Sequence, residues 1–205
     1  MTGKIKLNAT SGGGSVSFQA PSSTGDDRVI TLPTTADGTV LTTTNPKAGN
    51  IIQVISTVKK DVTSSDVSST GDFDFSGFNV AITPTSNSSK ILILVTVNVG
   101  WSSTMPFFMQ LKVNGSLCTD AIGDAAGSRN RSTMGGFQGH TGGIETVNCS
   151  FIHSPASTST QTYNLAFRHD SSQTKNVRIN ATSGDSDSAQ NGRWASSLIA
   201  MEVAG

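Results

Sequence analysis

The sequence predicts an all-β protein. Glutamate occurs at only two of the 205 positions, and Val, Ile, Thr and Phe supply most residues of the apolar runs. These β-branched and aromatic residues fit the pleated, half-buried surface of a sheet, whereas helices favour Glu, Lys, Ala and Leu at helical spacing. The apolar runs alternate at period two between turn residues, which predicts an antiparallel β-sandwich.

The chain opens with two short apolar runs, GSVSFQAP and RVITLP. The first run places Val16, Phe18 and Ala20 on one face, and the second places Val29 and either Ile30 or Leu32 there. A proline ends each run. Two short strands cannot bury these side chains by themselves. We therefore expect Val16, Phe18 and Leu32 to lie in an interface between copies of the chain.

A stretch rich in Thr, Pro and Gly, TTTNPKAGN, follows at 42–50 and has no apolar periodicity. It predicts three parts: a β-rich stalk or attachment segment at 1–45, a linker at 46–50 and a head domain at 51–205.

The head domain contains nine runs of strand length, at 51–59, 72–82, 90–101, 105–114, 116–122, 144–153, 161–169, 175–182 and 196–203. Asn114-Gly115 between two runs is a strong hairpin signal. In the run 72–82 the apolar residues change parity at Ser76-Gly77, which predicts a β-bulge. So many short strands predict a sandwich or jelly roll.

One run is apolar on both faces. In KILILVTVNVGW the odd positions from Ile91 to Val99 form a core face, yet Leu92 and Leu94 make part of the opposite face apolar. Burying a leucine stabilises by roughly 1.5–3 kcal/mol relative to exposure. We expect Leu92 and Leu94 to be covered by another subunit.

Charge and hydropathy exclude several partners. Fourteen basic residues balance 14 acidic ones without a basic patch, so no nucleic-acid partner is expected. No apolar run reaches the roughly 18–20 residues that cross a bilayer, and the opening residues lack the apolar segment of a signal peptide. We expect the chain to be made in a cytoplasm, and we expect no membrane insertion.

The candidate chemical groups are sparse. His153 and His169 each end a predicted strand, and His140 lies in the glycine-rich loop GGFQGHTGG, so none has metal-ligand spacing. The segment DFDFSG resembles the start of a calcium loop but lacks its final Glu, and GDSDSAQNG predicts a solvated turn. No nucleophile motif or carboxylate pair is present, so we expect no enzyme activity, cofactor or metal.

The cysteines Cys118 and Cys149 could pair, but alternation in ETVNCSFIH puts Cys149 on the same face as Val147 and Phe151. A small buried thiol in a reducing compartment is the preferred interpretation, and a disulfide is the alternative.

Longer phrases of the sequence resemble known proteins. GGSVSFQAPSS and RVITLPTTADGTVLTTT resemble a segment near the amino end of tail-fibre and other virion proteins of marine podoviruses, notably cyanophages. AIGDAAGSRNRST, SFIHSPASTSTQTYNLAFR and SLIAMEVAG resemble the domain that follows it. The resemblance implies a virion protein with a trimeric jelly-roll head similar to tumour-necrosis-factor-like and complement-type heads.

The expected function is that of a homotrimeric short fibre used in host-cell attachment. Its amino-terminal segment would bind other phage virion proteins, and its head would bind a host-surface glycan or protein. The alternative is a capsid-decorating or tail-assembly protein without a receptor. A secreted cytokine-like ligand is disfavoured because the chain lacks a signal peptide.

Strand direction suggests where a receptor would bind. Hairpin connections reverse the chain, so the loops at 60–71, 102–105, 123–142 and 170–174 should share one end, and the loops at 83–89 and 154–160 the other. The first set gathers aromatic and basic residues, which are enriched in contact surfaces. The candidates for receptor contact are Trp101, Arg129, Arg131, Phe137, His140, Arg168 and His169. The alternative is that the arginines are solvated and Trp101 packs in the core.

Overall fold

Strands make up the regular structure of the described residues, apart from one short 3-10 helix. The computed structural model describes residues 4–19, 25, 46–68, 72–140, 142–170 and 172–205. The chain divides into two compact units, Met1–Val40 and Leu41–Gly205. The stalk boundary at 45 and the linker at 46–50 stay predictions.

The first unit contains a β-hairpin, in which β1 (Lys4–Asn8) pairs antiparallel with β2 (Ser15–Gln19). The predicted strand around Val16 and Phe18 is confirmed as β2. Strand β1 was not predicted, because two apolar residues in KIKLN are too few to establish a period. The predicted run RVITLP, with Leu32, lies outside the described residues.

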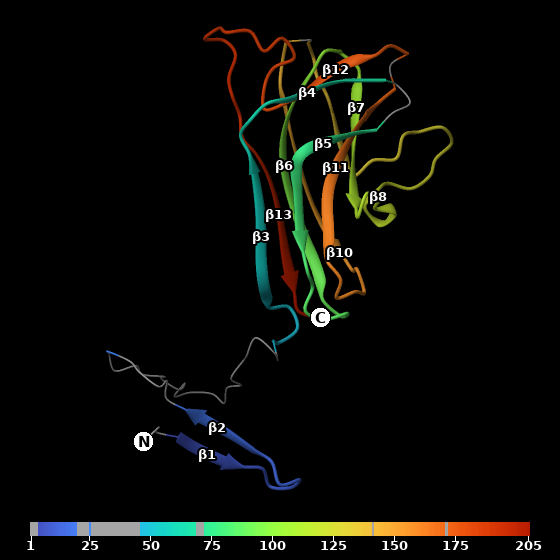
Figure 1. The fold of residues 1–205 in the computed structure, drawn as a ribbon. Coiled ribbons are helices and arrows are strands. Elements are labelled where there is room, and N and C mark those ends of the chain that lie inside the picture. The colour runs from blue at the N-terminus through green and yellow to red at the C-terminus, as the bar shows by residue number, and fades with distance from the viewer. Residues whose placement is uncertain (1–3, 20–24, 26–45, 69–71, 141, 171) are drawn as a thin grey trace, which may run out of the picture. The chain divides into compact units, whose positions relative to one another are not determined.

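The second unit is an antiparallel jelly roll (Figure 1). One sheet has the order β3 (Ile51–Lys59), β13 (Ser196–Val203), β6 (Lys90–Trp101) and β10 (Glu145–His153). Strands β12 (Lys175–Ile179) and β4 (Thr63–Val67) extend it at one end, where β12 pairs with β6. The other sheet has the order β5 (Phe73–Ile82), β11 (Gln161–His169) and β7 (Pro106–Val113), with β8 (Ser116–Leu117) and β9 (Met134–Phe137) along β7.

The core lies between the two sheets, as alternation predicts. Inward residues of β6, among them Ile93 and Val97, pack with residues of β11 such as Leu165. The largest rings gather at one end of the core, where Phe167 lies 5.2 Å from the Trp101 ring and 5.5 Å from the Phe107 ring. Such ring pairs contribute about 0.5–1.5 kcal/mol beyond burial of their area.

The predicted β-bulge is confirmed in β5. Asn79 pairs with Asn164, whereas Asp74 pairs with Ala166, so β5 contains more residues than β11 between the two pairs. Gly77 lies in this segment with φ of 72°, a conformation that costs other residues about 1–2 kcal/mol. The bulge restores inward orientation to the apolar residues on both sides of it.

Four strand predictions need correction. The run 116–122 forms only the two-residue β8 and then the 3-10 helix η1 (Thr119–Ala121), and the run 175–182 ends as a strand at Ile179. Strand β4 lies inside the predicted loop 60–71. Strand β9 lies inside the predicted loop 123–142. Its glycines looked like loop residues, but a Cβ on Gly135 would lie 2.5 Å from the carbonyl oxygen of Phe107. Close packing against β7 therefore requires glycine there.

The loops at 83–89 and 154–160 lie at the same end of the jelly roll. The end that carries Ile51, here called the proximal end, includes the Ser- and Pro-rich loops. Gln53 Nε2 donates to the carbonyl oxygen of Thr83 at 2.7 Å, and the Thr83 and Thr160 hydroxyls lie 2.7 Å apart. The predicted location of the loops 83–89 and 154–160 is therefore confirmed. The opposite, distal end is where β3 and β6 finish.

Candidate functional site

The outer surface of the sheet β3-β13-β6-β10 carries a row of apolar residues that crosses all four strands. Met201 pairs with Val54 on one side and with Leu92 on the other, and Leu92 pairs with Ile152. Residues directly opposite in antiparallel strands share a face, so these four side chains are neighbours on the outside of the sandwich. We call this surface, with Ile199, Leu94 and Val58 beside the row, the apolar outer face.

This face is accessible in the isolated chain. Val54, Val58 and Ile152 are 52–56% exposed, and Leu92, Leu94, Ile199 and Met201 are half-buried. Among the outward-facing positions of these four strands, all of them within the described residues, only Lys90 is charged. A contiguous apolar patch of this kind is uncommon on monomeric proteins and marks an interaction surface.

The outer surface of the opposite sheet is different. Lys112 Nζ lies 2.9 Å from Asp74 Oδ1, and an Arg168 nitrogen lies 3.9 Å from Asp72 Oδ1. Ion pairs of this kind are compatible with solvent and contribute little to association. The two faces of the sandwich therefore have different chemistry, and the face without ion pairs is the one suited to burial.

At the distal end, two predicted contact residues are core residues. Trp101 and His169 are at most 1% exposed, and their rings lie 4.9 Å apart. Trp101 Nε1 donates to the carbonyl oxygen of Met105, and His169 Nε2 lies 2.7 Å from the carbonyl oxygen of Val67. The prediction that these two side chains touch a receptor is wrong, because both are enclosed by the domain; for Trp101, the alternative of core packing is confirmed.

The accessible groups at the distal end lie at the last residue of β9 and just after it. Gln138 is buried; its Oε1 accepts from the Trp101 backbone N–H at 3.0 Å, and its Nε2 donates to the carbonyl oxygen of His140 at 2.6 Å. Phe137, which precedes Gln138 in the chain, is 59% exposed, and His140, which follows it, is exposed as well. The sequence pattern does not reveal the role of Gln138, because that role depends on a hydrogen bond with the backbone of Trp101 at the end of β6.

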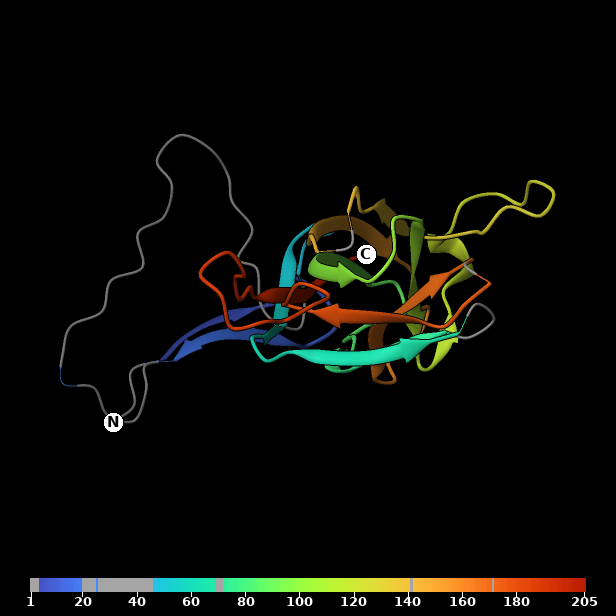
Figure 2. The same ribbon diagram turned by 90° about the horizontal axis from the view of Figure 1, so that it is seen from above.

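The predicted loop 123–142 has two parts in different places. Residues 123–133 leave the sandwich beside β7, where Gln110 Nε2 donates to the carbonyl oxygen of Arg131 at 2.6 Å, and they extend away from it (yellow in Figures 1 and 2). The Arg129 and Arg131 side chains bond to carbonyl oxygens of this same segment. The structure therefore does not gather Arg129 and Arg131 with His140, and the single distal surface predicted from the sequence needs correction.

Arg168 is half-buried on the outer surface of β11, in the ion pair with Asp72. It lies beside the distal end but faces outward from the sheet, so it joins the polar surface described above.

A buried carboxylate holds the proximal loop 83–89. Glu202 is fully buried, and its Oε1 accepts from both the backbone N–H and the hydroxyl of Thr85, at 2.6 and 2.7 Å. Its Oε2 accepts from Gln53 Nε2 at 2.5 Å. Burial acts to raise the pKa of Glu202, but the hydrogen bonds from Gln53 and Thr85 favour the charged form and hold the pKa below its ordinary value. The arrangement fastens a loop to the last strand.

The titratable groups near β8 form a structural pair. His153 Nδ1 lies 2.9 Å from Tyr163 Oη. Burial lowers the pKa of His153 and raises the pKa of Tyr163, so both are neutral near pH 7.

Cys118 and Cys149 are free thiols, and burial raises the pKa of each. Neither thiol is therefore activated as a nucleophile.

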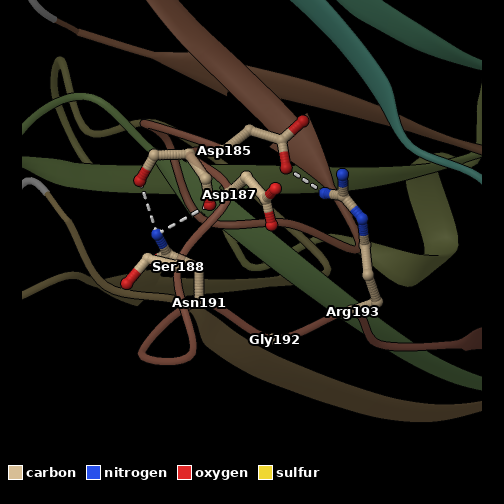
Figure 3. A pocket seen from close by; sticks show the side chains of 7 residues that line it. Asp185, Asp187, Ser188, Asn191, Gly192 and Arg193 are labelled. Carbon is tan, nitrogen blue, oxygen red and sulfur yellow. Dashed lines mark hydrogen bonds and ion pairs between the residues drawn. The ribbon is translucent and has the colours of Figure 1, made fainter.

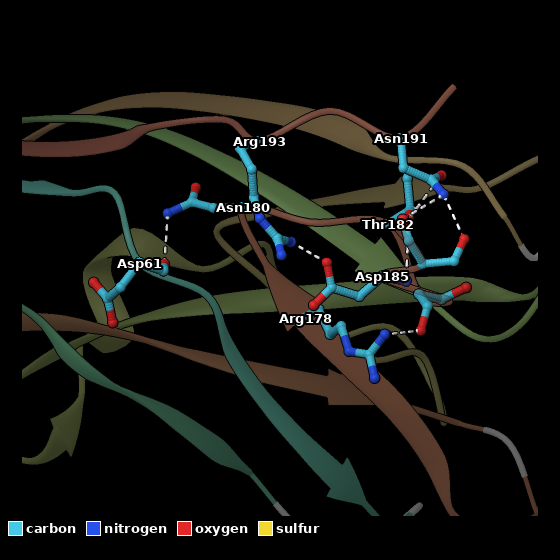
Figure 4. Close-up of polar contacts among 9 residues, drawn as sticks. Asp61, Arg178, Asn180, Thr182, Asp185, Asn191 and Arg193 are labelled. Carbon is cyan, nitrogen blue, oxygen red and sulfur yellow. Dashed lines mark hydrogen bonds and ion pairs between the residues drawn. The ribbon is translucent and has the colours of Figure 1, made fainter. Parts of the chain in front are cut away.

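The acidic loop at 184–192 is bonded internally. It borders a hollow of about 220 Å³ (Figure 3), where Asp185 forms an ion pair with Arg193. Asn191 Nδ2 donates to Ser186 Oγ at 2.7 Å, and Thr182 Oγ1 donates to Asn191 Oδ1 at 3.2 Å (Figure 4). These bonds engage the side chains of Asp185, Ser186 and Asn191, as expected for a turn.

Within the described ranges, no group of three or more His, Cys, Asp or Glu side chains is arranged to hold a metal ion. The same residues contain no helix long and apolar enough to span a membrane.

No protein-family model matches the chain, and no curated protein sequence matches it. Two solved structures are similar at 13% identity: that of the infectious bursal disease virus Gx strain, with a TM-score of 0.35, and that of the infectious bursal disease virus VP2 subviral particle, with a TM-score of 0.37. They cover 96% and 93% of this chain, and 46% of each neighbour's chain. The chain thus spans less than half the length of these neighbours.

Proposed function

We propose that this chain is a structural protein of a virion that assembles as a homotrimer through the apolar outer face of its jelly roll. The observation that carries the proposal is the row Val54, Met201, Leu92 and Ile152, which crosses four strands without a charge. In an assembly this row lies against the same sheet of neighbouring copies.

A second copy fits this face better than a foreign protein with a charged surface. The face has no ion pairs to satisfy, and it repeats on every copy, so a rotation axis closes the contact without leaving an apolar edge in solvent. Three copies agree with the sequence resemblance to phage fibre proteins. The polar surface with Asp74 and Lys112 then faces outward, where its ion pairs stay hydrated.

Host attachment is the proposed use of the assembly. At the distal end, Phe137 as the last residue of β9 presents an exposed aromatic ring, and His140 presents an imidazole on the loop that the buried Gln138 holds in place. Exposed aromatic residues on an anchored loop suit contact with a glycan or protein surface. The amino-terminal segment is proposed to bind other virion proteins, and the chain is proposed to have no catalytic role.

Labelling of intact particles tests the proposal. Antibodies raised against the folded head domain, visualised on purified particles by electron microscopy, are expected to mark tail fibres. Labelling on capsid faces instead would replace attachment by capsid decoration. Particles that carry no label, while the chain is detected in the infected cell, would overturn the virion role.

Host contact is tested separately with the purified protein. Substitution of Phe137→Ser is expected to reduce binding to host cells at unchanged mass and folding. The matched control is Phe108→Ser, which removes a half-buried phenylalanine from the outer surface of β7. Equal binding by the wild type and Phe137→Ser would contradict the distal contact.

A further inference from the structure

The hairpin β1–β2 is amphipathic. Ile5 pairs with Phe18, and Leu7 pairs with Val16, so one face carries four large apolar side chains. These side chains are 49–67% exposed. The sequence pattern had indicated only Val16 and Phe18, and the register adds two residues that complete the face.

The opposite face of the hairpin is polar. The alternating register pairs Lys4 with Gln19, Lys6 with Ser17 and Asn8 with Ser15. The turn is closed by a bond of 2.8 Å from the Ala9 N–H to the Gly14 carbonyl oxygen. One face therefore suits solvent and the other suits burial, although a two-stranded hairpin by itself is only marginally stable.

We infer that the apolar hairpin face, formed by Ile5, Leu7, Val16 and Phe18, packs against the same face of other copies of this chain. It holds no charge and no hydrogen-bonding side chain that would specify a different partner. Copies that turn this face toward a common axis leave Lys4 and Lys6 in solvent. The contact is a second self-association surface, separate from the apolar outer face of the jelly roll.

The size of the face favours a tethered copy over a freely diffusing partner. Four side chains offer far less than the roughly 800 Å² per partner of an independently stable interface. A copy already held through its jelly roll meets the hairpin at a high effective concentration, so a small contact is enough. In this respect the inference rests on the proposed self-assembly.

Single-cysteine variants of the full chain test the inference. Val16→Cys puts a thiol on the apolar hairpin face, and Ser17→Cys puts one on the polar face of the same strand. A short bismaleimide is expected to convert Val16→Cys into covalent dimers about tenfold more efficiently than Ser17→Cys, because only the first thiol faces another copy. Wild-type protein, with its buried Cys118 and half-buried Cys149, gives the background.

The mass of the same samples is measured by mass photometry, which distinguishes a failure of the hairpin contact from a failure of the proposed assembly. Adding Leu7→Ser to Val16→Cys is expected to lower the cross-linking yield. Equal yields from Val16→Cys and Ser17→Cys, or no yield above background, in protein with the mass of an assembly would overturn the hairpin contact alone. A monomeric mass would overturn the proposed assembly and the hairpin contact with it.

Discussion

Leu92 and Ile152 lie directly opposite each other on β6 and β10, and both point out of the sandwich. Leu92 is half-buried and Ile152 is mostly exposed. Leu92 has neighbours on both sides in the sheet, so it is the centre of the apolar outer face and the most informative place to put a charge.

Substitution of Leu92→Asp is expected to weaken assembly far more than folding. In the separate chain the carboxylate reaches water, but in the assembly it is buried without a partner, which costs several kcal/mol. A loss of about 3 kcal/mol lowers the association constant more than 100-fold. Mass photometry across a dilution series measures assembly, and urea unfolding of the separated chain measures folding.

The matched control is Asn164→Asp, which puts the same group on the half-buried outer surface of β11. It is expected to leave the mass unchanged. If Leu92→Asp and Asn164→Asp weakened assembly equally, or if Leu92→Asp lowered folding stability as much as assembly, the apolar outer face would not be the interface.

Substitution of Glu202→Gln is expected to destabilise the jelly roll by about 1–3 kcal/mol at pH 7, because charge-assisted bonds to Thr85 and Gln53 are lost. The folded-state pKa of Glu202 is lowered, so its stabilisation is present above the unfolded pKa of about 4.3 and is lost as the pH falls through the folded value. Urea unfolding at several pH values should show the gap between wild type and variant closing below about pH 4.

Glu145→Gln removes the chain's other glutamate, which is half-buried at the start of β10, and serves as the comparison. Its effect is expected to be smaller at pH 7. A gap between wild type and Glu202→Gln that stayed constant down to pH 3 would show that the charge of Glu202 has no stabilising role.

Asn180 combines buried bonds with a left-handed backbone. Its Nδ2 donates to the Lys59 carbonyl oxygen at 2.8 Å, its Oδ1 accepts from Ser196 Oγ at 2.6 Å, and its φ is 65°. Asn180→Ala and Asn180→Gly both lose these bonds, but only glycine adopts this φ without strain. Asn180→Ala should be less stable than Asn180→Gly by about 1–2 kcal/mol in urea unfolding. Equal stability would show that the backbone shifts to relieve the strain.

Substitution of Gly135→Ala tests the packing of β9. An added Cβ would lie 2.5 Å from the Phe107 carbonyl oxygen, so β9 must move away from β7. A loss of about 1–3 kcal/mol is expected, as in other overpacked sites. At Gly123 an added Cβ would meet nothing within 4 Å, so Gly123→Ala should change the free energy of unfolding by less than about 0.5 kcal/mol. Similar losses for both would contradict the close contact.

The sequence was sufficient for strands whose alternation is long and uninterrupted. The runs 90–101, 161–169 and 196–203 match β6, β11 and β13, and the bulge at Ser76-Gly77 follows from a change of parity. Strand β9 could not be predicted, because its glycines are required by a close approach of another strand and carry no apolar pattern.

The interaction surfaces were only partly predictable for a related reason. Leu92 and Leu94 were visible because one strand is apolar on both faces. Val54, Met201 and Ile152 belong to three other strands, and only the register of the sheet brings them into one row with Leu92. Tryptophan is common in contact surfaces, but Trp101 is buried because it packs against rings supplied by another strand, which the sequence does not show.

The mass of the purified full chain in solution tests the central claim most directly. Light scattering coupled to size exclusion, or mass photometry, is expected to give about three times the chain mass of 21.2 kDa at micromolar concentration, because the apolar outer face is then covered by other copies. A folded species at 21.2 kDa that persists as the concentration is raised would contradict the claim that this face assembles the protein.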